Sequence, residues 1–471
     1  MKLLAIISLV LLLIACSDQQ TFTEPKFDVA ELQPGGAMTT KRLYTRSFVY
    51  PGKALSRKQQ LDFWTGFSLF RDPWVIAPST TEDRDGLGPL FNTRSCVRCH
   101  TAGSRAKADK TGEILPFPLV IRLGSVESKI TTVDPVYGGQ IQPRAIRFNH
   151  EKLTESTEGE AWLKLDYRKI SGQFSDGESY ELWQPSYQLS KLAYGELSSH
   201  IGLSPRFAPN VFGAGLLNAI DEADLLAQED SQDTDQDGIS AVYNRVPDVV
   251  TGKVSVGRFG FKAKHPNLYQ QVAAAFRDDI GITNNLFLSE SCTGSQTACQ
   301  QASSVGGHNA AEIPDKLLDL TVKFNEFLGV PPARDLQSKQ VNKGRKVFYQ
   351  LGCQQCHTPS YTTAKNYPIA ALAGQKIWPY TDLALHDMGA DLADGVYEFK
   401  ANGSEWRTPP LWGIGLQKKV TGEQRYLHDG RARTIQEAIL WHGGEAQAAK
   451  QAFSELDLTQ RQALIKFLRA I

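Results

Sequence analysis

Two copies of one short cysteine motif carry the clearest chemistry in this 471-residue sequence. Residues 96–100 read Cys-Val-Arg-Cys-His, and residues 353–357 read Cys-Gln-Gln-Cys-His. The C-x-x-C-H spacing is the attachment signature of c-type haem, in which two thiols add to the vinyl groups and the adjacent imidazole binds the iron. A thioredoxin-like pair or half a zinc site leaves the histidine in both copies unexplained. The sequence therefore predicts two covalently bound haem c groups, with Cys96, Cys99, Cys353 and Cys356 for attachment and His100 and His357 as axial ligands.

The residues before each motif repeat a second pattern. Gly66 and Phe70 precede the first motif, and Gly344 and Phe348 precede the second, with the same spacing. A glycine and an aromatic residue four apart share one helix face, so another helix can approach closely at the glycine. We therefore expect each haem loop to follow a helix that packs on a partner helix.

The end of the chain supplies a candidate partner for the second of these helices. Thr459 and Gln462 have the spacing of a capping box, which predicts a helix start. An apolar stripe with helical spacing follows, for which packing is the whole interpretation. The stripe consists of Leu464, Ile465, Leu468 and Ile471.

Between the two helical units the pattern changes to short alternating runs. From Leu119 to about Tyr187, runs such as LVIRLGS and AWLKLDY are separated by Asp-Gly and Gly-Gly turns, which is typical of hairpins. We expect a mainly α protein of two cytochrome-c-like haem domains, the first with a β-hairpin-rich insertion. The predicted boundaries are 46–335 for the N-terminal domain and 336–471 for the C-terminal domain.

The first residues have the features of an export signal. Lys2 is followed by an apolar run over residues 3–14, which is too short to span a membrane. Residues 13–16 (Leu-Ile-Ala-Cys) look like a bacterial lipobox, which implies cleavage before Cys16 and lipidation of that residue. An ordinary signal with a chance cysteine is the alternative.

These features predict a domain order and a location. Residues 1–15 are expected to be a signal peptide, and residues 16–45, which have few large apolar groups, a lipid-anchored flexible tether. Ser17 rather than Asp follows the cysteine, which under the usual sorting rule favours the outer membrane over the inner one. We therefore expect a periplasmic protein whose only membrane contact is its lipid anchor.

Export also sets the expected state of the remaining cysteines, because thiols in an oxidising compartment pair or carry a ligand. Cys292 and Cys299 lie in a polar stretch without helical or strand periodicity. A local disulfide is the preferred interpretation, since no histidine or acid is spaced for a metal site beside them.

An acidic run in the first half resembles the opening of a calcium loop. Asp233, Asp235 and Asp237 alternate before Gly238, but Asn244 stands where a bidentate Glu should be. The run is thus either a Ca²⁺ site or a solvated acidic turn.

The charge balance excludes one class of partner. Lys and Arg together number 51, as do Asp and Glu, so the formal net charge is zero. A nucleic-acid-binding protein would show a basic excess, and we expect no such partner.

Several longer stretches resemble the di-haem oxidoreductases, peroxidase-like proteins that are also labelled thiol oxidoreductases and are related to bacterial di-haem cytochrome c peroxidase and MauG. The distance from Cys96 to Cys353 is larger than in the classical di-haem peroxidases. The matching stretches are DGLGPLFNTRSCVRCH (85–100), DTDQDGISAVYNRV (233–246), GRFGFKA (257–263), LHDMG (385–389), EWRTPPLWGIG (405–415) and YLHDGRARTIQEAILWHGGEA (426–446).

The resemblance implies different roles for the two haems. The N-terminal haem, with His100 proximal, would react with peroxide, and the C-terminal haem, with His357 proximal, would receive electrons. The relatives place a Met or Tyr fourteen positions after the start of their HDG motif as the sixth ligand of the second haem. That position is His442 here, counted from His428, so we predict bis-His ligation, with Met388 as the alternative.

Other site residues are less determined. His386 and His428 are expected to hydrogen-bond near the second haem, and no ligand role is assigned to His150, His200, His265 or His308. The catalytic residues beside the first haem stay unassigned, because Glu82, Asp83 and Asp85 fit a surface turn. Four residues could form an aromatic bridge between the haems, with packing as the default: Trp64, Trp74, Trp406 and Trp412.

Three functions fit these features. The first is a peroxidase-like enzyme that reduces H₂O₂ with electrons from a small donor cytochrome or another redox protein. The second is a MauG-like oxidase that modifies a partner protein or a metal-bearing ligand. The third is a non-catalytic electron-transfer partner of a periplasmic metal-uptake system.

Overall fold

The computed structural model describes residues 27–41, 47–106, 112–114, 119–127, 131–149, 152–156, 158–305 and 311–471. The predicted signal peptide, Cys16 and the first part of the predicted tether lie outside these residues. Within the described ranges no helix combines the length and the apolar character that crossing a bilayer requires.

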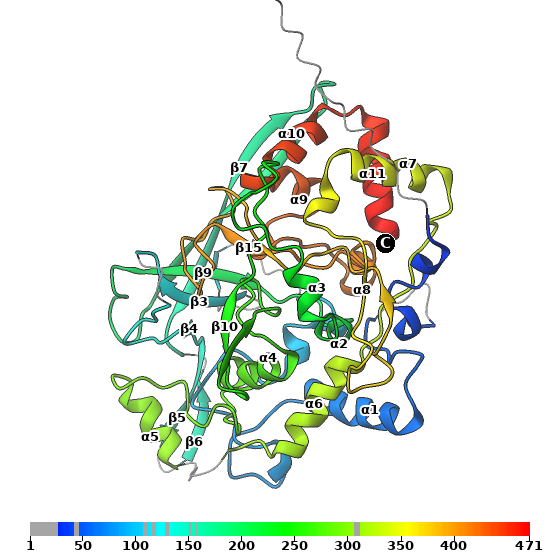
Figure 1. Cartoon of the computed structure of the whole chain (residues 1–471). Helices are drawn as coiled ribbons and strands as arrows, with labels where there is room; N and C mark the ends of the chain where they lie inside the picture. The colour runs from blue at the N-terminus through cyan, green and yellow to red at the C-terminus, as the bar shows by residue number, and fades with distance from the viewer. Residues whose placement is uncertain are drawn as a thin grey trace, which may run out of the picture.

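Helices and strands follow one another in groups along the described chain (Figure 1). The helices are α1 (Arg57–Arg71), α2 (Ala214–Asn218), α3 (Glu222–Leu226), α4 (Leu268–Ala275), α5 (Thr297–Val305), α6 (Asp315–Phe327), α7 (Lys339–Gln350), α8 (Gln417–Thr421), α9 (Ile435–Trp441), α10 (Gln447–Glu455) and α11 (Leu458–Ala470). The strands are β1 (Leu90–Phe91), β2 (Gly112–Ile114), β3 (Leu119–Ser125), β4 (Gln140–Ile141), β5 (Arg144–Asn149), β6 (Lys152–Ser156), β7 (Trp162–Gln173), β8 (Ser179–Ser190), β9 (Ile201–Phe207), β10 (Arg245–Asp248), β11 (Lys253–Val256), β12 (Tyr361–Thr362), β13 (Lys376–Ile377), β14 (Leu385–Asp387) and β15 (Glu405–Arg407).

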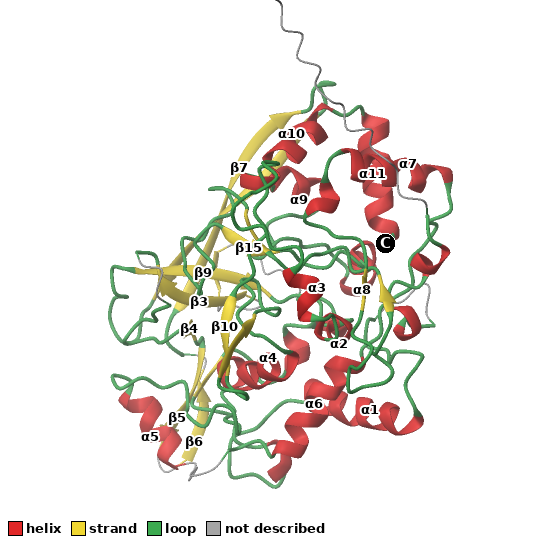
Figure 2. Ribbon diagram, in the orientation of Figure 1, coloured by secondary structure: helices red, strands yellow, loops and turns green. Residues whose placement is uncertain are grey.

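The fold is mixed α/β, with 31% helix and 21% strand, so the prediction of a mainly α protein was wrong. Most strands lie on the left in Figure 2, and the strands form antiparallel sheets with the orders β1-β5-β6, β2-β7-β8 and β4-β3-β9 and three two-stranded ribbons. The alternating region was recognised, but its size was underestimated. Strands β7 and β8 pair over their full length, from Trp162 opposite Ser190 to Gln173 opposite Ser179.

Two helix pairs repeat in the structure, as the glycine spacing predicted. Helix α7 packs on α11, where a Cβ on Gly344 would lie 1.9 Å from the carbonyl oxygen of Ala463. Helix α1 packs on α6, where a Cβ on Gly66 would lie 2.0 Å from the carbonyl oxygen of Leu320. Only glycine permits such close approach of two backbones.

The phenylalanine four residues after each glycine packs against a phenylalanine of the partner helix. The rings of Phe70 and Phe324 lie 4.8 Å apart between α1 and α6, and those of Phe348 and Phe467 lie 5.4 Å apart between α7 and α11. The partner of α11 was predicted correctly, although its capping box joins Asp457 to Gln460 rather than Thr459 to Gln462.

The two predicted haem units share one apolar core. Phe63, Phe70 and Phe324 from the first helix pair belong to the same buried cluster as Leu383 and Trp412 from the second half of the chain. A separate core lies inside the β insertion, between β3, β7 and β9. The halves are therefore packed into one body rather than joined by a linker.

Part of the segment assigned to the tether is folded against the second haem unit. Met38 is fully buried, and the carboxylate of Glu31 lies 2.8 Å from the guanidinium of Arg345 on α7. The hydroxyl of Tyr380 donates to the same carboxylate. Residues 27–41 thus form a strap that runs from the second unit, which Glu31 contacts, to the shared core, which contains Met38.

Candidate functional site

The first C-x-x-C-H motif forms a tight loop. A 3-10 turn covers Cys96–Arg98, and the amide of His100 donates to the carbonyl of Cys96 at 2.9 Å. The thiols of Cys96 and Cys99 are unpaired. Burial, aided by the charge of Asp279, raises the pKa of the Cys96 thiol to about 12, so it stays protonated.

A hydrogen bond at Nδ1 holds the imidazole of His100 in one orientation. Its Nδ1 lies 2.8 Å from the carbonyl oxygen of Pro209, which only accepts, so Nδ1 carries the proton. Burial lowers the pKa of His100 to about 4, so the ring is neutral. Nε2 has no hydrogen bond within the described residues, which is the arrangement of an iron-binding histidine fixed by an outer partner.

The second motif repeats this geometry. A 3-10 turn covers Cys353–Gln355, and the amide of His357 donates to the carbonyl of Cys353 at 2.9 Å. The Nδ1 of His357 donates to the carbonyl of Tyr380 at 3.1 Å, and burial with the nearby His442 lowers the pKa of His357 to about 4.

The donor sets of both loops fit haem c. Each loop offers two unpaired thiols and one neutral imidazole with a free Nε2. In contrast, Cys292 and Cys299 form a disulfide, with 5.8 Å between their Cα atoms. Cys299 lies on α5, a short helix that the polar sequence around it did not indicate.

His442 lies where a further ligand to the second haem is expected. It follows α9, and its Nδ1 donates to the carbonyl of Ala438 at 2.7 Å. The Nδ1 atoms of His100 and His357 also donate to backbone carbonyls. The pKa of His357 is lowered by His442, which indicates that the two imidazoles lie close together. Met388 also lies at this corner, because its carbonyl oxygen would be 3.0 Å from a Cβ on Gly443.

His386 is engaged on both ring nitrogens. Its Nε2 lies 2.8 Å from the carboxylate of Asp382, and its Nδ1 lies 2.7 Å from that of Glu445. Burial alone would lower the pKa of His386, but these carboxylates raise it well above its usual value. The ring is an imidazolium that also hydrogen-bonds Cys356, so it lies at the second haem loop without a lone pair for iron.

His428, which was expected to hydrogen-bond near the second haem, stacks on an aromatic ring. Its ring lies 3.7 Å from that of Trp406, with an angle of 6° between the planes. Burial lowers the pKa of His428 to about 3. The next residue, Asp429, pairs with Arg431 at 2.8 Å.

The tryptophans proposed as an aromatic bridge differ in their burial and in their neighbours. Trp64 is 47% exposed, and Trp74 packs on Phe276 in the first half. Trp412 is buried in the shared core that also borders Cys96, and its indole N–H has no partner among the described residues.

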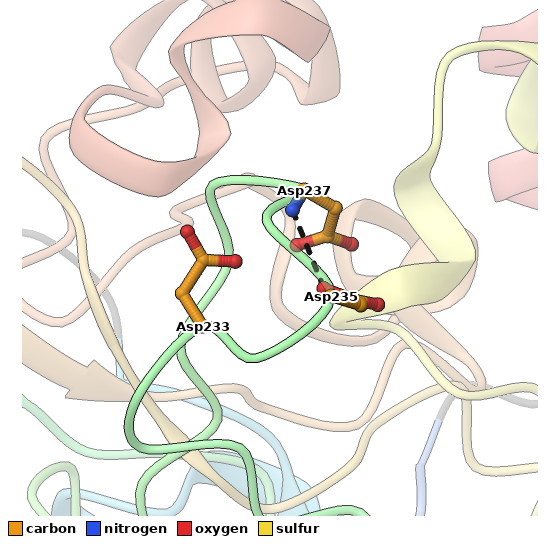
Figure 3. Close-up of side chains that lie close together, drawn as sticks. All are labelled: Asp233, Asp235 and Asp237. Atoms are coloured by element: carbon orange, nitrogen blue, oxygen red, sulfur yellow. Dashed lines mark hydrogen bonds between the residues drawn. The ribbon is translucent and has the colours of Figure 1, made fainter.

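The acidic run forms an exposed loop beside the second haem motif (Figure 3). Carboxylate oxygens of Asp233, Asp235 and Asp237 lie within 4.8 Å of one another. Asp237 also accepts a hydrogen bond from Gln355, within the second C-x-x-C-H motif. Asn244 is fully buried and donates to the carbonyl of Lys262, so it does not complete the loop.

A family comparison agrees with this geometry. Residues 119–471 match the family model described as "Di-haem oxidoreductase, putative peroxidase". The chain belongs to the di-haem oxidoreductase family. The match includes the second C-x-x-C-H motif and begins after the first. No curated protein sequence matches this di-haem oxidoreductase closely enough to count as a relative.

Proposed function

We propose that this di-haem oxidoreductase is an exported, peroxidase-like enzyme. It reduces H₂O₂ at the N-terminal haem, and electrons enter at the C-terminal haem from a small donor cytochrome or another redox protein. The haems are attached covalently through the two C-x-x-C-H motifs. A lipid on Cys16 anchors the protein to the outer membrane on the periplasmic side.

One observation carries this assignment of roles. His442 lowers the pKa of His357 and, like His357, donates its Nδ1 proton to a backbone carbonyl, so that its Nε2 is available to the same iron. Two imidazoles satisfy both axial positions of an iron, and a single one leaves the opposite position open. The first haem is therefore the reactive one, and the second stores or passes electrons.

The protein's own groups support this division. Bound haem supplies an iron that changes valence and moves electrons singly. The carbonyls of Pro209 and Tyr380 hold the proton on Nδ1 of His100 and His357, which directs each Nε2 toward the iron. His442 is the sixth ligand of the second haem, and Asp233, Asp235 and Asp237 form an optional Ca²⁺ site.

Electron paramagnetic resonance of the purified protein, with and without H₂O₂, tests the proposal. We expect one high-spin signal that H₂O₂ abolishes and one low-spin signal from the C-terminal haem. Two low-spin signals that ignore H₂O₂ would instead identify an electron carrier. Rapid reaction with H₂O₂ without turnover of a donor cytochrome would indicate a MauG-like oxidase of a partner.

A further inference from the structure

The strap, residues 27–41, carries a buried acid to the second haem unit, and no role described so far uses it. The carboxylate of Glu31 lies 2.8 Å from the guanidinium of Arg345 on α7, and the hydroxyl of Tyr380 donates to the same carboxylate. Arg345 also donates to that hydroxyl at 3.4 Å, and all three side chains are buried. The desolvation cost of a buried ion pair largely offsets its attraction, so stability alone does not account for this cluster.

Tyr380 begins a segment that runs along the second C-x-x-C-H loop. Its backbone carbonyl accepts the Nδ1 proton of His357 at 3.1 Å. The next two amides, those of Thr381 and Asp382, donate to carbonyls of the loop and of the residue after it, at 2.9 and 3.0 Å. One residue therefore contacts the strap through its side chain and the motif histidine through its backbone.

The backbone of Tyr380 has a conformation that depends on its surroundings. Its φ angle is +55°, in the left-handed region that bulky residues rarely adopt. Such a conformation persists only where neighbouring contacts hold it. The ring packs on those of Phe348 and Phe467, with centroids 5.7 and 5.9 Å away, and the hydroxyl is held by Glu31 and Arg345. The strap therefore supplies part of the polar support that keeps the Tyr380 carbonyl in place.

The strap is itself fixed by backbone hydrogen bonds on both sides of Glu31. The amide of Ala333 donates to the carbonyl of Leu32 at 3.2 Å, and the amide of Trp378 donates to the carbonyl of Pro34 at 2.8 Å. The second of these bonds lies two residues before the tyrosine that holds the motif histidine. The strap and this segment are therefore one connected unit, which is how an outer contact can fix a ligand precisely.

The first haem loop is held in a different way. The carbonyl that accepts the Nδ1 proton of His100 belongs to Pro209, whose side chain has no polar group through which another segment could hold it. A change that is transmitted through the hydroxyl of Tyr380 therefore reaches the second loop directly and not the first. The two loops of one molecule can thus serve as test and reference.

We propose that Glu31 is a positioning residue that acts through Tyr380 on the hydrogen bond of His357 and thereby keeps the reduction potential of the C-terminal haem low. A carbonyl that accepts the Nδ1 proton makes the imidazole a stronger electron donor, which favours the oxidised iron. The charge of Glu31 also balances that of Arg345, which alone favours the reduced iron. The strap, which follows the proposed lipid anchor along the chain, thus sets how readily this haem accepts electrons. This inference rests on the proposed function.

Spectroelectrochemical titration of the full-length di-haem protein, followed at the bands of the low-spin haem, tests the proposal without relying on turnover. E31Q leaves Arg345 without its counter-charge and weakens the hold on Tyr380. The ratio of reduced to oxidised C-terminal haem at a fixed potential should therefore rise about tenfold, which is an upward shift of about 59 mV. Y380F keeps the pair of Glu31 and Arg345 and loses only the hydroxyl contact, so the ratio should rise about threefold.

The matched control is D28N, which removes one negative charge from the same strap. Asp28 pairs with Lys376 at 2.6 Å at the solvent-accessible end of the strap, and asparagine can still cap the turn Val29–Leu32 as Asp28 does. The ratio in D28N should stay within twofold of the wild-type value.

A second measurement separates positioning from charge. In electron paramagnetic resonance, the g values of a low-spin haem depend on how its axial imidazole planes are oriented. E31Q and Y380F should both change these g values, whereas D28N should not. The high-spin signal of the N-terminal haem should stay the same in every variant, because Pro209 holds that histidine independently of the strap.

The outcomes separate this inference from the proposed function. If the wild-type protein shows no low-spin signal, or no high-spin signal that H₂O₂ abolishes, the proposed function fails. If both signals are present but E31Q and Y380F match D28N within twofold, only the role of Glu31 is overturned. A shift in E31Q with Y380F at the wild-type value would be an effect of charge alone and would also overturn it. If E31Q does not bind both haems, the comparison of Y380F with D28N gives the decision.

Discussion

The two haem regions share one scaffold but differ in what surrounds it. In both, a helix with glycine and phenylalanine four apart crosses a partner helix, and a backbone carbonyl fixes the motif histidine. Around the second motif the structure adds His442 and the His386 imidazolium, whereas Asp279, next to the Arg122–Asp278 pair, lies just before the first. The proposed division between reaction and electron storage would thus come from the surroundings of two similar attachment units.

The largest expected effect tests whether the two attachment loops are equivalent. C353A and C99A should each lower the pyridine-haemochrome absorbance per chain, by up to half, because each removes one thioether bond. The combined variants C96A/C99A and C353A/C356A should each lose one complete haem. Retention of both haems by either double variant would contradict the attachment assignment.

The next test addresses the second region alone. H442A should convert the low-spin signal of the C-terminal haem to high-spin, because the iron loses its sixth ligand, as seen by electron paramagnetic resonance. M388L serves as the matched control and should leave that signal unchanged. The opposite pattern would assign the ligand to Met388.

A third test concerns the buried pair that follows His428. Burial would raise the pKa of Asp429, but Arg431 brings it down to about 2. Because this lies below the ~3.9 of an unfolded aspartate, the stabilisation is complete above about pH 5 and is lost as the pH falls toward 2.

D429N leaves Arg431 buried without its counter-charge and should cost about 3–5 kcal/mol of unfolding free energy at pH 7. Urea unfolding should show the difference from wild type shrinking below about pH 4. The control is D83N, which changes an exposed aspartate. A difference that stays constant down to pH 2 would show that the ionised carboxylate is not the stabilising form.

The smallest expected effect compares the two helix crossings directly. G66A and G344A each place a Cβ within about 2 Å of a carbonyl oxygen and should each cost about 1–3 kcal/mol, measured by thermal unfolding. G294A, where a Cβ meets no atom within 4 Å, should be neutral. Loss at only one crossing would show that the two units are not packed equivalently.

The sequence predicted the features that depend on local spacing. The haem motifs, the glycine and phenylalanine pattern, the terminal helix and the alternating region all appear in the structure. The predicted fold class was wrong because it was based mainly on the two helical units. The insertion contributes more strand than expected, since β7 and β8 are twelve residues long each.

Features that depend on distant backbone were not predictable. The carbonyl of Pro209 acts on His100 from 109 residues away, and a carbonyl has no signature in a sequence. Helix α6 was not identified as the partner of α1, because it lies far downstream. The sequence assigned no role to His265, since only the fold brings it into a cluster of charges with Arg122 and Asp278.

The shared apolar core has a consequence for how the protein matures. Side chains as late in the chain as Trp412 and Leu416 complete the interior that borders Cys96. Since a polypeptide emerges from its N-terminus, the first attachment loop stays accessible until nearly the whole chain has been delivered. If haem is attached at Cys96 as proposed, the attachment would take place on an unfinished fold, before the late residues complete the core beside this loop.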